Sequence, residues 1–234
     1  MKTVRTTLVQ NRIRTMYKGI RSASNTRDPL YPMNRALGFQ VVMLEGFISN
    51  SEALYFMKLL QQERWIKTIG EIGFNGGHSS YIFLKTRPDT RVLSFDLGMH
   101  NYVKVAKNYI DKQFPGRHQL VLGDSLETVP EYFRQHPETR CDLLFVDGGH
   151  SYTNAYTDLH NFEPFAHPGT LVMMDDLIPW EPWGEGPCQA WGESVAQGYI
   201  QQVGLYRNGI PVSEVEKHKG DKVWGIGRYT GATN

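Results

Sequence analysis

Glu71-Ile-Gly-Phe-Asn-Gly-Gly-His-Ser-Ser80 joins a short apolar run to a predicted helix through a glycine-rich turn. Gly73 and Gly77 allow a backbone with positive φ and the close approach of a ligand to the main chain. A helix that begins near Gly76 directs free N–H groups and the positive end of its dipole toward such a ligand. The turn therefore predicts a nucleotide-like ligand at the carboxyl end of the strand that precedes it.

The spacing of the glycines argues against the dinucleotide-binding fold and a nicotinamide-dependent reductase. That fold requires G-x-G-x-x-G, and here Asn75 and His78 stand where the second and third glycines would be. What remains is E-x-G-x-x-x-G, with Glu71 at the end of the strand. A tight turn without any ligand is the alternative interpretation of this stretch by itself.

The composition is that of one globular α/β domain. The chain has 234 residues, of which 40% are hydrophobic and 21% are charged, as is usual for such a domain. Cys141 and Cys188 form no C-x-x-C pair. No apolar run approaches the roughly 20 residues that span a bilayer. We therefore expect a cytoplasmic protein with no membrane partner.

The N-terminal arm is basic, whereas the rest of the chain is acidic. Residues 1–35 contain eight Lys or Arg and one acid, which leaves 17 basic and 23 acidic residues elsewhere. Apolar residues recur at helical spacing from Val9 to Ile20, which predicts an amphipathic helix that covers the active site or contacts a partner subunit in a homodimer. A solvated charged face is the alternative. We divide the chain into a basic arm or lid helix, residues 1–45, and a domain, residues 46–234, whose acidity argues against nucleic acid as a partner.

Strands and helices alternate along the predicted domain. Residues 27–33 are expected to form an irregular connector, because each proline disfavours helix in the residue before it. Ser49 and Glu52 have capping-box spacing and predict a helix of about 13 residues. Strands are expected near 67–73, 91–96, 119–123, 141–147, 169–175, 200–206 and 222–229, and helices near 77–86, 101–114, 126–135, 153–165 and 188–197. This pattern predicts a Rossmann-like α/β fold, a doubly wound, mostly parallel seven-stranded sheet that closes with an antiparallel C-terminal hairpin strand.

Acids stand at or just after the ends of the first parallel strands. Asp96 ends the second strand about 20 residues after the turn, where an acid accepts hydrogen bonds from ribose hydroxyls. Asp124 follows the third strand, Asp147 the fourth, and Asp175 with Asp176 the fifth. One such acid is more often a helix cap, but five at one sheet edge repel one another unless a cationic ligand or a metal offsets their charge. The array predicts a cation-binding site.

These motifs together resemble those of class I S-adenosylmethionine-dependent methyltransferases, of the family known as methyltransferase domain 24. The matching segments are Glu71–Ser79, Ser94–Leu97, Phe114–His118, Gly123–Ser125, Phe145–His150 and Met174–Asp176. The resemblance covers roughly residues 66–230 and leaves residues 1–45 outside. It implies S-adenosylmethionine as the cofactor, and the sulfonium and ammonium groups of that molecule suit a row of acids. The residues implied to contact the cofactor are Glu71, Gly73, Asn75, Gly77, Ser79, Asp96, Asp124, Ser125 and Asp147.

The acids after the fourth and fifth strands resemble the metal site of catechol O-methyltransferase-like enzymes. The resemblance implies a Mg²⁺ ion held by Asp147, Asp175 and Asp176, since hard cations prefer oxygen ligands. Asp176 stands where the catechol enzymes carry Asn. His150, three residues after Asp147, stands where those enzymes carry the Lys or His that takes the substrate proton. It is therefore implied as the catalytic base, with Asp147 beside it; the alternative is a histidine that hydrogen-bonds Asp147 or caps the next helix.

The resemblance predicts transfer of a methyl group to a hydroxyl oxygen of a small-molecule acceptor. One alternative is a metal-independent transferase to a nitrogen or a carboxylate, and another is a cofactor-binding protein without catalysis. Trp180, Trp183 and Trp191 are predicted to form the substrate wall, because aromatic faces close pockets and can flank a sulfonium. Packing under a loop is the alternative for these rings.

Overall fold

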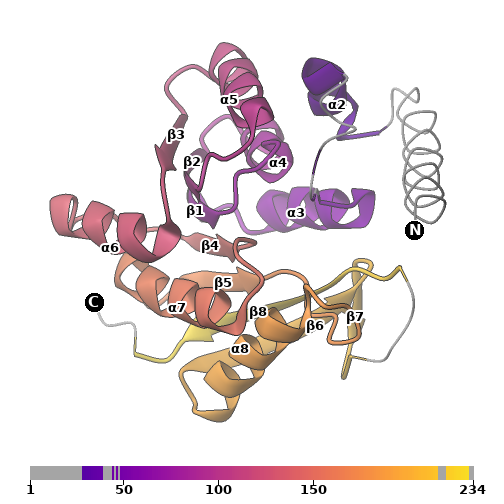
Figure 1. Ribbon diagram of the computed structural model, residues 1–234, viewed down its shortest axis with the longest axis vertical. Helices are drawn as coiled ribbons and strands as arrows, with labels where there is room; N and C mark the ends of the chain where they lie inside the picture. Colours follow the sequence, from indigo (N-terminus) through magenta and orange to yellow (C-terminus); the bar gives the residue numbers. More distant parts are fainter. Residues whose placement is uncertain (1–27, 39–43, 45, 47, 216–219, 232–234) are drawn as a thin grey trace, which may run out of the picture.

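One mixed β-sheet forms the centre of the fold. The computed structural model describes residues 28–38, 44, 46, 48–215 and 220–231, and the helix expected between Val9 and Ile20 lies outside them. The sheet has eight strands in the order β3-β2-β1-β4-β5-β8-β6-β7 (Figure 1). The strands are β1 (Thr68–Ile72), β2 (Arg91–Asp96), β3 (His118–Leu122), β4 (Leu143–Val146), β5 (Leu171–Met174), β6 (Ile200–Arg207), β7 (Ile210–Val212) and β8 (Val223–Tyr229).

The strand order confirms the doubly wound α/β fold. Strands β1 to β5 are parallel, whereas β8 pairs antiparallel with both β5 and β6. The chain moves outward from β1 in one direction to β3 and then returns to place β4 on the other side of β1. In such a sheet the ligand site lies outside the carboxyl ends of the strands at the point of reversal, which here is between β1 and β4.

Helices cover both faces of the sheet. Figure 1 shows α3, α4 and α5 on one face and α6, α7 and α8 on the other. The helices are α2 (Tyr31–Leu37), α3 (Asn50–Gln62), α4 (His78–Thr86), α5 (Asn101–Gln113), α6 (Ser125–Gln135), α7 (Tyr152–Phe162) and α8 (Glu185–Ala196), with a 3₁₀ turn η2 (Glu163–Phe165). Within the described ranges, none of them is long and apolar enough to cross a membrane.

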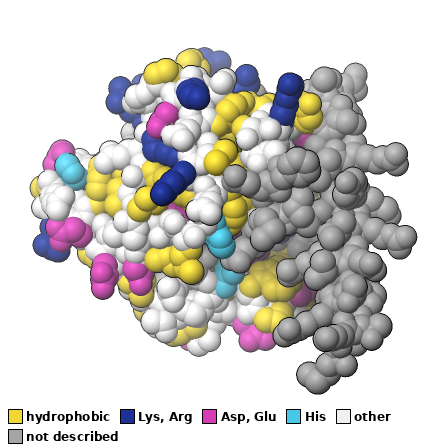
Figure 2. All heavy atoms as spheres, turned by 45° about the horizontal axis from the view of Figure 1, so that its top comes forward, with side chains coloured by type: hydrophobic (Ala, Val, Ile, Leu, Met, Phe, Trp, Pro, Cys, Tyr) yellow, Lys and Arg dark blue, Asp and Glu magenta, His cyan; other side chains and the backbone are white. Residues whose placement is uncertain are grey.

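The side chains of each strand alternate between two hydrophobic cores, as the pleat requires. Phe145 faces α3 and α4, where its ring centroid lies 5.1 Å from that of Phe56 and 6.2 Å from that of Phe83. The next residue, Val146, packs in the opposite core with Phe162 of α7. On the outer face shown in Figure 2, hydrophobic side chains form small patches between charged ones, as is usual for a globular domain.

The sheet has one more strand than the seven predicted. Strand β7 has three residues and pairs with the end of β6. Its Pro211 cannot donate a ladder hydrogen bond, which disfavours a strand in a sequence pattern, but β7 is an edge strand and edges tolerate proline. Asn208 and Gly209, with φ of 51° and 84°, form the turn between the two strands.

The capping box at the start of α3 is confirmed, and the predicted connector before it is partly helical. Ser49 Oγ accepts from Glu52 N at 3.2 Å, and Ser49 N donates to Glu52 Oε2 at 2.6 Å. The irregular connector predicted at residues 27–33 was wrong in part, because α2 begins at Tyr31. Pro32 lies in the first turn of α2, where a helix has no partner for the missing N–H and proline is tolerated.

Candidate active site

The glycine-rich turn brings the ends of β1 and β4 into contact. Gly73 has φ of 97°, and a Cβ at this position would lie 1.8 Å from the carbonyl oxygen of Asp147. Gly77, with φ of 71°, is the N-cap of α4. Asn75 has φ of 48°, a conformation that Asn tolerates better than most residues. The turn therefore leads directly into the N-terminus of α4, and free N–H groups at a helix N-terminus are a common feature of nucleotide sites.

Glu71 lies beneath this turn and is fully buried. Its carboxylate accepts hydrogen bonds from Ser79, from Ser80 at 2.5 Å and from Ser94 at 2.5 Å. Burial raises the pKa of Glu71, against the three hydroxyl groups, which lower it. In this position Glu71 and Ser79 tie α4 to β1 and β2, so they hold the turn in place; a direct contact of either with the cofactor stays a prediction.

Asp96 and Asp124 form hydrogen bonds with backbone N–H groups at the strand ends. Asp96 Oδ2 accepts from Asn75 N and Oδ1 from Gly98 N, each at 2.7 Å. Asp124 caps α6 by accepting from Leu126 N at 3.0 Å, and Ser125 is the first residue of that helix. The helix-cap interpretation thus holds for Asp124, although an exposed cap can also meet a ligand. The structure brings Asp96 to the glycine turn and leaves Asp124 at the adjacent strand end.

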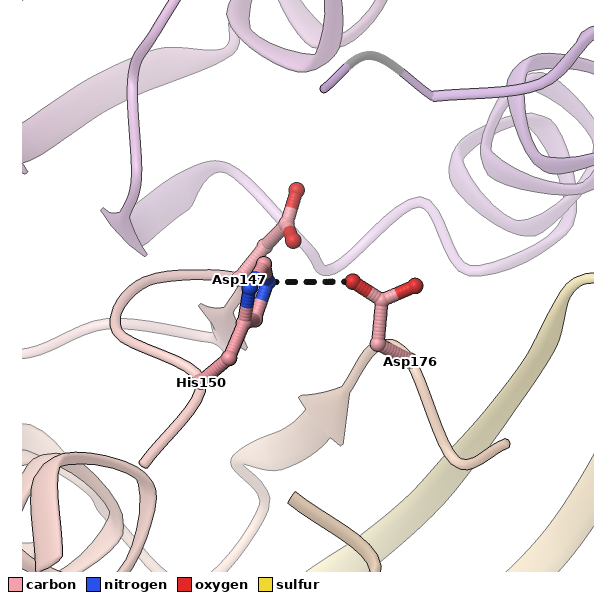
Figure 3. A group of neighbouring side chains, drawn as sticks. All are labelled: Asp147, His150 and Asp176. Carbon is pink, nitrogen blue, oxygen red and sulfur yellow. Dashed lines mark ion pairs between the residues drawn. The ribbon is translucent and has the colours of Figure 1, made fainter. Parts of the chain in front are cut away.

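The acids after β4 and β5 form a centre with His150. Nε2 of His150 lies 3.1 Å from Asp176 Oδ2, and Figure 3 shows Asp147 beside the imidazole. Donor atoms of Asp147, His150 and Asp176 all lie within 4.8 Å of one another. Asp176 has φ of 55°, so the chain turns sharply after β5 and directs this carboxylate toward β4. The alternative that His150 merely bonds Asp147 is not what the structure shows, since its partner is Asp176.

Two charged residues of this centre were not predicted, Lys222 and Glu52. Lys222 Nζ lies 2.9 Å from Asp176 Oδ1 and 3.7 Å from Asp175 Oδ2. Glu52, in the first turn of α3, is 1% exposed, and its Oε1 has no hydrogen-bond partner in the part of the chain that the structure describes. No sequence pattern marked Lys222, which reaches the acids because the antiparallel pairing of β8 with β5 places the start of β8 beside the end of β5.

The pKa of Asp176 is shifted in the opposite direction from the pKa values of Asp147 and Asp175. Burial raises the pKa of Asp147 well above its ordinary value, and the Asp176 carboxylate adds to the rise. Burial likewise raises the pKa of Asp175, and the charge of Glu52 adds to the rise. For Asp176 burial acts in the same direction, but the hydrogen bond from His150 and the charge of Lys222 outweigh it and lower the pKa. His150 and Lys222 therefore stabilise the charged form of Asp176.

Residues before α3 lie over the glycine turn. His78 Nε2 is 2.8 Å from Asn34 Oδ1 of α2, and burial lowers the pKa of His78 to about 4. Asn75 Nδ2 donates to Gly46 O at 2.9 Å. His78 is the first residue of α4, within the helix predicted near residues 77–86. The segment that contains α2 is thus tied to the turn at two points.

The predicted tryptophan wall does not hold for all three rings. Trp191 is buried, its Nε1 donates to Gln202 Oε1 at 2.8 Å, and it packs against Gly225 of β8. For this residue the packing alternative is correct. Trp183 is 47% exposed and Trp180 is half-buried on the loop after Asp176, so these two rings remain candidates for the substrate side of the site.

Asp158 of α7 is a buried acid below the loop that carries Asp147 and His150. A Cβ at Gly148 of that loop would lie 3.2 Å from Asp158 Oδ2. Burial raises the pKa of Asp158 to about 7, and the charge of Asp124 adds to the rise. The folded protein therefore holds a proton on this carboxyl that the unfolded chain releases near pH 4.

Replacing Asp158 by Asn is expected to change how stability depends on pH. The stabilisation from the protonated acid is complete below about pH 4 and is lost as pH rises through about 7, by up to about 4 kcal/mol. Asn does not ionise, so Asp158→Asn should lose less stability than the wild type when the pH is raised from 4 to 8. Urea unfolding of both proteins at pH 4, 6 and 8 measures this difference. Parallel stability curves would show that Asp158 does not titrate in this range.

The fold is like that of Rossmann-like methyltransferases. Residues 71–177 match the model of a family described as a methyltransferase domain. A search of curated proteins found no match.

Several solved structures share the fold. An O-methyltransferase from Bacillus cereus in complex with SAH aligns with a TM-score of 0.67 at 15% identity, over 87% of this chain and 92% of that chain. TomG, an O-methyltransferase from Streptomyces achromogenes involved in tomaymycin synthesis, in complex with SAM, has a TM-score of 0.65 at 18% identity and coverages of 88% and 92%. The SAH-bound methyltransferase PaMTH1 from Podospora anserina has a TM-score of 0.66 at 14% identity and coverages of 93% and 96%.

Proposed function

We propose that the protein transfers the methyl group of S-adenosylmethionine to a hydroxyl oxygen of a small molecule. The observation that carries this proposal is the contact between the glycine turn and the acid centre, since Gly73 meets the backbone of Asp147 directly. A cofactor on the turn would therefore lie next to His150 and Asp176. The cofactor complexes of the Bacillus and Streptomyces structures support the choice of S-adenosylmethionine.

In this proposal His150 takes the proton of the acceptor hydroxyl. Its side chain is 42% exposed, so an acceptor can reach it, and Asp176 Oδ2 at 3.1 Å orients the ring. A base held by a second group is the arrangement that general-base catalysis requires. The glycine turn aligns the sulfonium methyl group with the acceptor oxygen, and this alignment supplies much of the rate enhancement.

The acid centre fits a hard divalent cation such as Mg²⁺. A cavity of about 10 Å³ between the ends of β4 and β5 is lined by Asp147, Asp175 and Asp176, which is close to the space that one water molecule takes. Asp175 is 3% exposed, and its Oδ1 has no hydrogen-bond partner among the residues described. When bound, Mg²⁺ would lower the pKa of the acceptor hydroxyl and orient it. The three aspartates are the residues that would hold it.

Titration calorimetry of S-adenosylmethionine into chelator-treated protein tests the cofactor. We expect saturable one-to-one binding, followed in the presence of Mg²⁺ by release of S-adenosylhomocysteine with one or more members of a panel of phenol, catechol and sugar acceptors. Activity that is insensitive to a chelator would favour the metal-independent alternative. Absence of cofactor binding with and without Mg²⁺ would contradict the methyltransferase proposal.

A small molecule is the proposed acceptor, since TomG acts in the synthesis of tomaymycin and the site opens beside His150. We also propose a cytoplasmic location, a homodimer contact through the basic arm of residues 1–45, and the division of the chain between residues 45 and 46. Residues 33 and 37 of α2 are buried, so the part of the arm near this boundary packs with the domain.

A further inference from the structure

We propose that the ammonium group of Lys222 and a divalent cation are alternative occupants of the site formed by Asp175 and Asp176. This inference rests on the proposed metal site and adds the element that controls its occupation. Lys222 Nζ lies 2.9 Å from Asp176 Oδ1 and 3.7 Å from Asp175 Oδ2. At these distances the chain itself already supplies a positive charge to the acid pair.

Both carboxylate oxygens of Asp176 already have a partner in this arrangement. Its Oδ1 faces Lys222, and its Oδ2 faces His150 at 3.1 Å. An ion that binds Asp176 must displace one of these two groups or share its oxygen with it. Sharing places a divalent cation within a few ångströms of an ammonium group, where like charges repel strongly in a partly buried site. Binding of the ion and the contact with Lys222 are therefore opposed.

Lys222 is held in this position by its backbone. Its N–H donates to Asn208 Oδ1 at 3.0 Å, and its carbonyl oxygen accepts from Asn208 N at 2.9 Å. Asn208 in turn donates from Nδ2 to Asp221 Oδ1 at 2.7 Å. The turn between β6 and β7 thus fixes the point from which the lysine side chain reaches the acids. The backbone of Lys222 is thus ordered without a ligand, so its ammonium group is positioned in advance as a counter-ion of the two acids.

The unpartnered oxygens nearby show that the site can still accept a cation. Asp175 Oδ1 and Glu52 Oε1 are buried and have no hydrogen-bond partner in the described part of the chain. Both acids lie close enough to Lys222 to act on its charge. One lysine does not satisfy all of these oxygens, so a cation that moves the ammonium aside would gain ligands that Lys222 leaves unused. In this exchange a divalent cation replaces the ammonium group of Lys222 beside the acids.

Removing the charge of Lys222 tests the inference. We expect Lys222→Met to bind Mn²⁺ at least about tenfold more tightly than the wild type, since the side chain keeps its length and loses the repulsion. Lys222→Arg keeps the charge and should bind like the wild type. The probe is Mn²⁺ alone, added to chelator-treated full-length protein. Binding is followed by calorimetry and by the decrease in the electron paramagnetic resonance signal of free Mn²⁺. Lys222→Gln is the second neutral variant, should the methionine variant fail to fold by circular dichroism.

The outcomes separate this inference from the proposed function. Tighter binding in the neutral variants, abolished by adding Asp176→Asn, would support the exchange. Equal Mn²⁺ affinity in the wild type and the neutral variants would overturn it and leave the metal site standing. No Mn²⁺ binding in any variant, with S-adenosylmethionine still bound, would overturn both the exchange and the metal site but not methyl transfer. If the wild type does not bind S-adenosylmethionine at all, the proposed function itself is rejected.

Discussion

Replacing Gly73 by alanine is expected to lower the free energy of unfolding by at least about 3 kcal/mol, or to prevent folding. A Cβ at this position would lie 1.8 Å from the carbonyl oxygen of Asp147, and the neighbour it meets is backbone. The end of β1 is held by the bond from Gly73 N to Phe95 O at 2.8 Å, and the end of β4 by the bond from Asp147 N to Ile72 O at 2.9 Å. Any protein that does fold should have lost its affinity for S-adenosylmethionine, because the turn must open.

Gly116→Ala is the matched control for this prediction. Gly116 has φ of 70°, but a Cβ there meets nothing within 4 Å. The conformational penalty alone should cost about 1 kcal/mol. Urea unfolding of both variants, with calorimetry of the cofactor, measures the two effects together. Equal losses of stability in the two proteins would show that positive φ, rather than the contact between the ends of β1 and β4, makes Gly73 necessary.

Features that depend on local sequence were predicted correctly. The capping box of Ser49 and Glu52 requires only neighbouring residues, and the glycine turn was visible from the positions of Gly73 and Gly77. The order of acids after the parallel strands also followed from sequence, because parallel strands end at the same edge of a sheet. The structure accordingly brings Asp147 and Asp176 together, as the strand ends indicated.

Features that depend on contacts between distant segments were not predicted. Lys222 reaches Asp176 only because β8 inserts between β5 and β6 in an antiparallel register, and a lysine at the start of a strand has no pattern that marks it. Glu52 was identified as a capping residue, which it is, but its position at the acid centre depends on how α3 packs. The burial of Glu71 beneath the turn also depends on such contacts, because the three serine hydroxyls that bind its carboxylate come from α4 and β2.

The prediction with the largest kinetic effect concerns His150. We expect His150→Ala to lower turnover about 10²- to 10⁴-fold, the usual contribution of a positioned general base. S-adenosylmethionine affinity should stay within about twofold, because the imidazole faces Asp176 rather than the glycine turn. The measurement is the release of S-adenosylhomocysteine with the acceptor that the wild type uses, together with calorimetry of the cofactor. Unchanged turnover would reject the base assignment.

His167→Ala provides the matched control, because the chain contains a second histidine–aspartate pair away from the site. His167 Nε2 lies 3.0 Å from Asp142 Oδ1, just before β4 and β5 begin, whereas the pair of His150 and Asp176 follows the ends of these strands. Removing His167 should lower stability and leave turnover within about twofold of the wild type, since no cofactor or acceptor reaches that edge in the proposed site. A similar fall in turnover for both variants would mean that loss of a histidine–aspartate contact weakens the fold in general, and that His150 acts by holding the sheet ends rather than by taking a proton.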